Sequence, residues 1–272
     1  MSVSGVGPGG RLPGEVDPAG EAVPAAAGPA VGRGGPPLRP VIGAPAAARV
    51  FSRHLEDAIA LNTARRSVYS KLSGGASEEV SDRLIASEKL DHLVTGYFDR
   101  EARRFNDRGI PIVTGDFVPM SGAKPAEAPL ERRGKTPALE LAKLEAEVIA
   151  FHAQLLLSVV VGHFDKISER AFALSQEIDR LEAKTRSNLA MTKHVVDSIG
   201  LAALHAGRYS KMSGGETDTL AKQLIAAESV ALVNAVGTDR RAQEVQALGV
   251  GIIVNDVPEI PFQAEYRAAR PR

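Results

Sequence analysis

The chain of 272 residues has no cysteine and no tryptophan, and aromatic residues make up only 4% of it. Without thiols, disulfide bonds, thiolate metal sites and cysteine-based catalysis are excluded, and this composition fits a reducing cytoplasm. Because so few aromatic side chains are present, the core has to be built from Leu, Ile, Val and Ala, which suits packed helices better than a β-sandwich. We therefore expect a mainly α, cytoplasmic protein.

An excess of charge of one sign is also missing. Lys plus Arg and Asp plus Glu each total 33, so the formal net charge is zero, and no general nucleic-acid binding is expected. The first residues show no apolar run behind a positive cluster, so no signal peptide is expected. The most apolar stretch, residues 148–164, is short for a membrane span and contains two histidines and a glutamine. We interpret it as a buried helix and expect no membrane span.

The strongest pattern is an internal duplication. Residues 49–119 recur, at an offset of about 140 positions, as residues 189–258, without a gap until just before the final Val-Pro. About 20 of the first 68 aligned positions are identical, which chance would hardly give over an ungapped stretch. We therefore expect two copies of one supersecondary unit.

Each copy reads as helix, tight turn, helix and short strand. The glycines of the turns can adopt positive φ and stop the first helix, and Ser77 and Thr217 are expected to cap the second helix. Val80, Leu84, Leu90 and Leu93 are spaced along one face of that helix in the first copy, as in an amphipathic helix that packs on a core. The β-branched runs 110–113 and 250–254 could form two short strands. The turn residues are Ser73, Gly74 and Gly75 in the first copy and Ser213, Gly214 and Gly215 in the second.

A long apolar seam lies between the copies. Leu, Ile, Val and Phe alternate at spacings of three and four from residue 141 to residue 181, with a change of phase at Gly162, as in a coiled coil with an irregularity. The run 155–161 has no polar residue except Ser158, so burial on all sides is expected. Leu155, Leu156, Val159 and Val160 are therefore predicted association residues. The predicted map is a disordered Gly/Pro/Ala-rich arm (1–47), repeat 1 (48–119), a linker (120–136), a long amphipathic helix (137–184), repeat 2 (185–260) and a basic tail (261–272).

Both copies retain residue types that bind metals. A pseudo-two-fold arrangement of the copies could bring two histidines and four carboxylates together, which is the inventory of carboxylate-bridged di-metal sites in helical bundles. Such a site would take iron, manganese or zinc, and the protein would then be a metal-binding bundle or an oxidoreductase. The alternative is that these side chains cap, bridge or face solvent. The candidate ligands are His54, Asp57, Glu88, His194, Asp197 and Glu228.

Two other retained motifs have structural alternatives. The Tyr-Ser-Lys-x-Ser-Gly-Gly segment could cradle an anion with its backbone N–H groups, but it lacks the spacing of a phosphate loop, and a helix hairpin already explains its serines and glycines. The repeated pairs Asp99-Arg100 and Asp239-Arg240 are interpreted as ion pairs that fix helix register, with recognition of an anionic partner as the alternative. No Ser/His/Asp arrangement has motif support, so no catalytic residue is assigned.

Short segments of the second copy carry one resemblance. Residues 197–199 (Asp-Ser-Ile), 234–236 (Asn-Ala-Val) and 249–250 (Gly-Val) resemble the killing-trait proteins of bacterial R-bodies, which are small helical proteins that form ribbons. This resemblance covers under a quarter of the chain. Arg240 and Arg241 stand where that family tends to be rich in glutamine. The resemblance implies a bacterial assembly protein.

Taken together, these features favour a non-catalytic helical scaffold. A sustained apolar seam in a chain poor in aromatics and catalytic motifs indicates a protein that self-associates into a homo-oligomer or docks a protein partner. A filament, a ribbon or a killing-trait system are the settings that the resemblance implies.

Overall fold

The computed structural model describes residues 50–110, 134–249 and 260–270. Within these ranges the chain forms seven helices and no strand, which confirms the mainly α fold class. The predicted disordered arm, most of the linker and nearly all of both predicted strands lie outside the described residues. The helices are α1 (Val50–Ser73), α2 (Glu78–Asn106), α3 (Ala138–Val161), α4 (Phe164–Thr185), α5 (Ala190–Ser213), α6 (Asp218–Gln246) and α7 (Phe262–Ala269).

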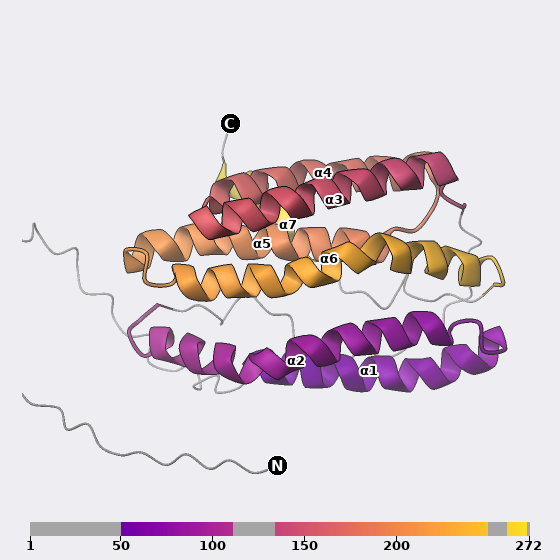
Figure 1. The fold of residues 1–272 in the computed structure, drawn as a ribbon, viewed down its shortest axis with the longest axis horizontal. Coiled ribbons are helices and arrows are strands. Elements are labelled where there is room, and N and C mark those ends of the chain that lie inside the picture. Colours follow the sequence, from indigo (N-terminus) through magenta and orange to yellow (C-terminus); the bar gives the residue numbers. More distant parts are fainter. Residues whose placement is uncertain (1–49, 111–133, 250–259, 271–272) are drawn as a thin grey trace, which may run out of the picture. The chain divides into compact units, whose positions relative to one another are not determined.

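The two aligned segments form the same helical hairpin, α1–α2 and α5–α6 (Figure 1). α1 and α5 have 24 residues each, and α2 and α6 have 29 each. Gly74 and Gly214 follow the first helix of each pair with φ of +60° and +65°. This left-handed conformation is inexpensive for glycine alone, so the predicted role of both glycines is confirmed.

The serine at the end of each first helix stabilises the start of the second. Ser73 Oγ accepts a hydrogen bond from the Ser77 backbone N–H at 3.0 Å, and Ser213 Oγ accepts one from Thr217 N–H at 3.2 Å. Ser77 and Thr217 occupy the N-cap positions, but neither side chain makes a capping bond there. The predicted N-cap positions are therefore correct, but the side-chain capping bonds are not made, because the Ser77 and Thr217 hydroxyls contact those of Ser73 and Ser213 instead.

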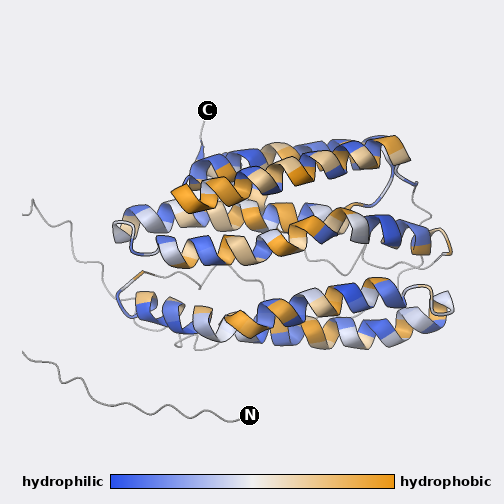
Figure 2. Cartoon of the chain, viewed as in Figure 1, coloured by the Kyte–Doolittle hydropathy of each residue, from blue (hydrophilic) through white to orange (hydrophobic). Residues whose placement is uncertain are grey.

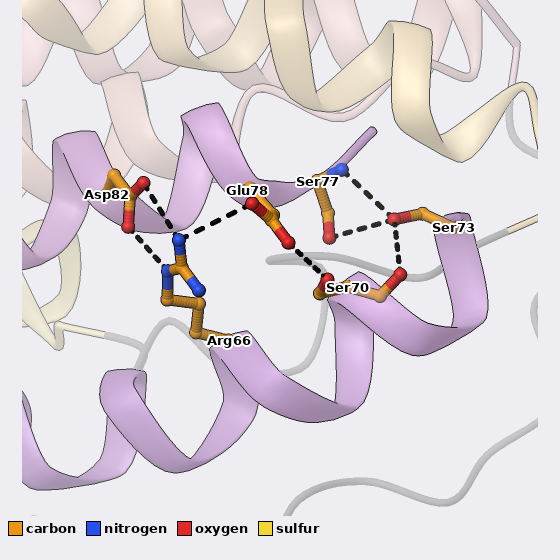
Figure 3. A network of polar contacts seen from close by, with 6 residues as sticks. All are labelled: Arg66, Ser70, Ser73, Ser77, Glu78 and Asp82. Carbon is orange, nitrogen blue, oxygen red and sulfur yellow. Dashed lines mark hydrogen bonds and ion pairs between the residues drawn. The ribbon is translucent and has the colours of Figure 1, made fainter. Parts of the chain in front are cut away.

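The first hairpin adds an ion pair across its turn that the second lacks. Figure 3 shows Arg66 of α1 pointing at two carboxylates of α2, with its Nε 2.5 Å from Asp82 Oδ1 and its Nη2 3.5 Å from Glu78 Oε2. The equivalent positions of the second copy hold Ala206 and Lys222. The shared turn therefore depends on the serines and glycines, and not on this ion pair.

The segment expected to form one long helix is two helices. Gly162 has a φ of +83°, and α3 and α4 on either side of it pack against each other. The N–H groups of Gly162 and His163 both donate to the Ser158 carbonyl at 2.9 Å, which closes the end of α3. The phase change at Gly162 therefore marks a reversal of the chain and not an irregularity in a continuous coiled coil.

The main core lies within the four helices α3, α4, α5 and α6. α4 packs on α5, α3 packs on α6, and each hairpin is closed by its own pair. The largest fully buried side chains lie on these four helices, on α7 or, for Leu189, at the residue before α5, as the packing of one continuous core requires. They include Phe151, Leu174, Ile178, Ile199 and Leu232.

The predicted basic tail forms a helix. α7 packs on α5 and α4, and the Phe262 ring is fully buried against Gly200. A Cβ atom at Gly200 would lie only 2.4 Å from this ring. Tyr266 stacks on Phe172 of α4 with ring centroids 4.4 Å apart. Two aromatic side chains thus dock a segment whose charge alone predicts a solvated tail.

The two hairpins contact each other reciprocally. Two small clusters, separate from the main core, join the turn end of one hairpin to the far end of the second helix of the other. Members of the two clusters are related by the 140-residue offset, so the repeats pack about a pseudo-two-fold axis between antiparallel α2 and α6. One cluster combines Tyr209, Leu220 and Leu224 with Ala102 and Phe105, and the other combines Tyr69, Val80 and Leu84 with Ala242 and Val245.

Candidate functional site

The six candidate metal ligands do not converge. Among the described residues, no group of three or more His, Asp or Glu side chains is placed to hold a metal ion. Asp57 instead lies 4.0 Å from Arg53 on the same helix, and Asp197 lies 3.2 Å from Lys193. His54 and His194 belong to no ligand group either. The geometry therefore favours the alternative interpretation, in which these side chains bridge helices or face solvent.

Glu88 and Glu228 are nevertheless placed unusually. They are repeat equivalents on α2 and α6, and Asp91 of α2 lies close enough to raise the pKa of both. Burial, with Asp91 adding to it, raises the pKa of Glu88 and of Glu228 to about 7, and burial raises that of Asp91 to about 6. Asn62 donates to Glu88 at 2.7 Å, and Ser198 bonds Glu228. Asp91 of one repeat thus lies near Glu228 of the other, whereas Glu88 bonds α1 within its own hairpin.

The repeated Asp-Arg pairs are not internal ion pairs. Asp99 accepts hydrogen bonds from the backbone N–H groups of Phe51 and Ser52 at 2.9 and 3.2 Å, at the start of α1. Asp239 does the same for Met191 and Thr192 at 3.1 and 2.8 Å, at the start of α5. Each aspartate satisfies N–H groups that a helix leaves unpaired.

The arginines that follow these aspartates do not pair with them. On α6, Arg240 bonds Glu145 of α3 at 2.6 Å. Burial raises the pKa of Asp239 to about 7, although the donors from Thr192 and Met191 act in the opposite direction. The expected register-fixing ion pair was therefore wrong in its partner, while the inference that the motif is structural agrees with the geometry.

The turn serines and glycines are explained by the hairpin. The Ser73 hydroxyl contacts the Ser77 hydroxyl at 3.0 Å, and Ser213 contacts Thr217 at 3.1 Å, so both hydroxyls are used within the turn. The geometry favours this role over anion binding for Ser73, Gly74, Gly75, Ser213, Gly214 and Gly215.

The predicted association residues divide into two sets. Leu155 and Val159 are buried in the core, with 1% and 7% of their surface exposed. Leu156 and Val160 are 46% and 75% exposed. Burial of this run on all sides was therefore the wrong expectation for one chain, because only its inner half contacts the bundle.

Exposed apolar side chains concentrate on three neighbouring helices. Among the described residues sixteen large hydrophobic side chains are exposed, and twelve of these lie on α2, α3 and α6. α2 and α3 each pack against α6, and Figure 2 shows apolar positions along all three. We call these twelve residues the α2–α6–α3 surface. They are Leu90, Leu93, Val94 and Tyr97 on α2, Leu139, Ile149, Leu156, Leu157, Val160 and Val161 on α3, and Val230 and Val233 on α6.

The sequence pattern did not predict the exposed apolar residues of α2 and α6. Leu90 and Leu93 were expected on the buried face with Val80, which is fully buried, but they are 61% and 79% exposed. The sequence does contain a signal for this exposed face, because both copies keep apolar residues at these two positions. The equivalent residues of the second copy are Val230 and Val233. Spacing alone could not separate a face that contacts the core from one that contacts a partner.

Two of the three helices also pass a membrane test. α3 and α6 are long and apolar enough to cross a membrane by length and composition, and a small part of each apolar window is buried inside the chain. Core helices of soluble proteins pass the same test. The predicted absence of a membrane span stays a prediction.

A shallow cleft lies between α3 and α4. Its volume is about 250 Å³, and its lining combines apolar side chains with Gln154, Ser158, Lys166 and Arg170. The lining contains no carboxylate and no histidine, and Glu147 lies 4.0 Å from Arg170 just outside it.

Comparison of the chain with models of known protein families, with curated proteins and with solved structures found no match. A functional proposal therefore rests on the exposed apolar side chains and the packing of the helices.

Proposed function

We propose that the chain is a non-catalytic helical scaffold of the bacterial cytoplasm that self-associates into an assembly. One observation carries the proposal: twelve of the sixteen exposed large hydrophobic side chains of the described residues lie on the three contiguous helices α2, α6 and α3. Soluble monomers rarely expose apolar patches of more than a few hundred Å². A surface of this kind is typical of a site where protein meets protein.

The size of the surface supports a specific contact. Fully burying one such side chain removes roughly 60–120 Å² from water, and these twelve are about half exposed. They therefore present roughly 600 Å² per chain, and two such surfaces reach about 1,200 Å², the lower end for specific interfaces. The resemblance to the ribbon-forming killing-trait proteins agrees with an assembly role.

The test is the concentration dependence of molar mass. We expect the wild type to associate between nanomolar and micromolar concentrations in analytical ultracentrifugation. Replacing Leu157 and Val160 together by Glu should weaken association by at least about 100-fold, because each loses roughly 1.5–3 kcal/mol of burial. Both are about three-quarters exposed in the single chain, so its folding should be unaffected.

A matched control places the same charges elsewhere. Val68 and Leu72 are exposed on α1, away from the α2–α6–α3 surface, and their replacement by Glu should leave association unchanged. A wild type that stays monomeric over the whole range would refute the proposal. Equal loss in both double variants would show that charge, and not this surface, controls association.

A further inference from the structure

Two equivalent stripes lie side by side on α2 and α6. Ala86, Leu90, Leu93 and Tyr97 follow one another at spacings of four, three and four, so they share one face of α2. Their counterparts on α6 have the same spacing. Because the pseudo-two-fold axis relates antiparallel α2 and α6, both stripes face the same side of the pair. The α6 stripe consists of Ala226, Val230, Val233 and Gly237.

Gly237 lies in the interior of α6 without an internal reason. A glycine destabilises the middle of a helix relative to alanine, yet a Cβ built on Gly237 would meet nothing within 4 Å. By contrast, Gly200 has to be a glycine because a Cβ atom there would overlap the Phe262 ring. On an exposed apolar stripe, a glycine at this place permits the close approach of another backbone.

The residues around Gly237 indicate what kind of molecule covers this face of α6. Between Gln223 and Thr238 the only ionisable side chain is Glu228, and no lysine or arginine is present. Membrane-surface helices carry cations that meet anionic headgroups, which this stretch of α6 does not offer. Small and β-branched residues at helical spacing suit close packing of another helix.

The symmetry of the stripes identifies the partner. Leu90 and Leu93 are exchanged with Val230 and Val233 by the pseudo-two-fold axis, so the surface has equivalent apolar stripes on both sides of the axis. Such a surface is suited to an isologous contact with its own copy. The stripes differ most at their ends, where Tyr97 on α2 corresponds to Gly237 on α6.

We propose that the α2–α6–α3 surface of a second copy of the chain packs face to face on this surface, with its closest backbone approach at Gly237. The inference rests on the proposed self-association and specifies its partner and contact point. A methyl group at Gly237 then separates the two copies, although it favours the helix of the single chain. Stability and association should therefore change in opposite directions.

Gly96 on α2 provides the matched control. It also lies inside a helix, and its Cβ would also meet nothing within 4 Å. It lies three residues after Leu93 but about 100° around the helix from Tyr97, so it is at the edge of the apolar stripe and not on its centre line. Gly96→Ala should raise the urea midpoint of the monomer and leave the dissociation constant unchanged.

The experiment measures urea denaturation below the dissociation constant and sedimentation above it. Gly237→Ala should raise the urea midpoint as Gly96→Ala does, but weaken association about tenfold, or about 1.4 kcal/mol. Gly237→Leu should abolish association. An associating wild type with unchanged affinity in both Gly237 variants overturns this inference and leaves the proposed function intact. A wild type that is monomeric alone, whether or not it co-sediments with phosphatidylcholine vesicles, overturns both.

Discussion

The α1–α2 and α5–α6 hairpins have the same helix lengths and the same turn, yet α3 and α4 pack mainly against the second. The side chains at equivalent positions explain this difference. Val196 and Leu232 of the second hairpin are fully buried in the core that α3 and α4 complete, whereas at the same places in the first hairpin Glu56 is exposed and His92 is half-buried. A shared backbone thus fixes the hairpin, and a few side chains decide what packs on it.

A difference between glycine and alanine at one position similarly explains why α7 packs on the second hairpin. The second hairpin has Gly200 beneath Phe262, and the first has Ala60 at the equivalent place. A Cβ at Gly200 would overlap the ring, so α1 could not receive a helix like α7 in the same way. The first hairpin is therefore adapted to solvent on the side where the second is adapted to neighbours.

Exchanging one buried residue for its half-buried equivalent should have the largest effect. Leu232→His removes a leucine from the core and buries an imidazole, so we expect a loss of about 3–4 kcal/mol in the free energy of unfolding. The reverse change, His92→Leu, removes a partly exposed contact with Glu56 and should alter stability by less than about 1 kcal/mol. Urea denaturation of both variants measures the difference. Similar losses would mean that the two outer faces are equivalent after all.

Exchanging the small residues should have an intermediate effect. Gly200→Ala forces the Phe262 ring away, and we expect a loss of about 1–3 kcal/mol, with faster tryptic cleavage at Arg267. Ala60→Gly should cost at most about 1 kcal/mol through helix propensity alone and leave that cleavage unchanged. Thermal denaturation and timed proteolysis provide the measurements. Unchanged cleavage in Gly200→Ala would show that α7 does not depend on this contact.

The half-buried glutamates that both hairpins share, Glu88 and Glu228, should make stability depend on pH. Folding raises the pKa of Glu88 and Glu228 to about 7 from an ordinary value of 4.5, so the folded chain binds their protons more tightly than the unfolded chain. Their contribution to stability is then fully present below about pH 4.5 and is lost as the pH rises through 7. We expect the melting temperature to be a few degrees higher at pH 5.5 than at pH 8.

The double variant Glu88→Gln and Glu228→Gln isolates this effect. Glutamine cannot ionise, so the pH-dependent difference should shrink in this variant, while Glu78→Gln, at the turn of the first hairpin, serves as the control. Melting curves at both pH values decide the matter. The same pH dependence in the wild type and the double variant would assign it to other groups, such as Asp239.

Most of the fold could be predicted because its signals are local. The Ser-Gly-Gly turns and the offset of 140 residues predict the hairpins and their bounds within a few residues. The division at Gly162 was missed, since spacings of three and four continue on both sides of it and a single glycine is tolerated inside a helix. Whether the chain reverses there depends on α5 and α6, which a local pattern does not describe.

The sequence pattern predicted only part of the α2–α6–α3 surface. Val160 was predicted as an association residue and is 75% exposed, but Leu90 and Leu93 were placed in the core, because periodicity identifies a face and not what covers it. Asp99 and Asp239 were noticed as retained residues, but their bonds reach back 47 or 48 positions to a helix start. Partners this distant depend on the geometry of the folded hairpin.

These aspartate bonds have a consequence for how the chain folds. Each hairpin is fastened at both ends, by its glycine turn and by the aspartate that returns to the start of its first helix, and every one of these contacts spans fewer than 50 residues. Both fastenings of a hairpin lie within its own segment of the chain, so closing it requires no residue of the other hairpin. A gene segment that encodes such a hairpin can therefore be duplicated, and neither copy of the hairpin needs the other in order to close.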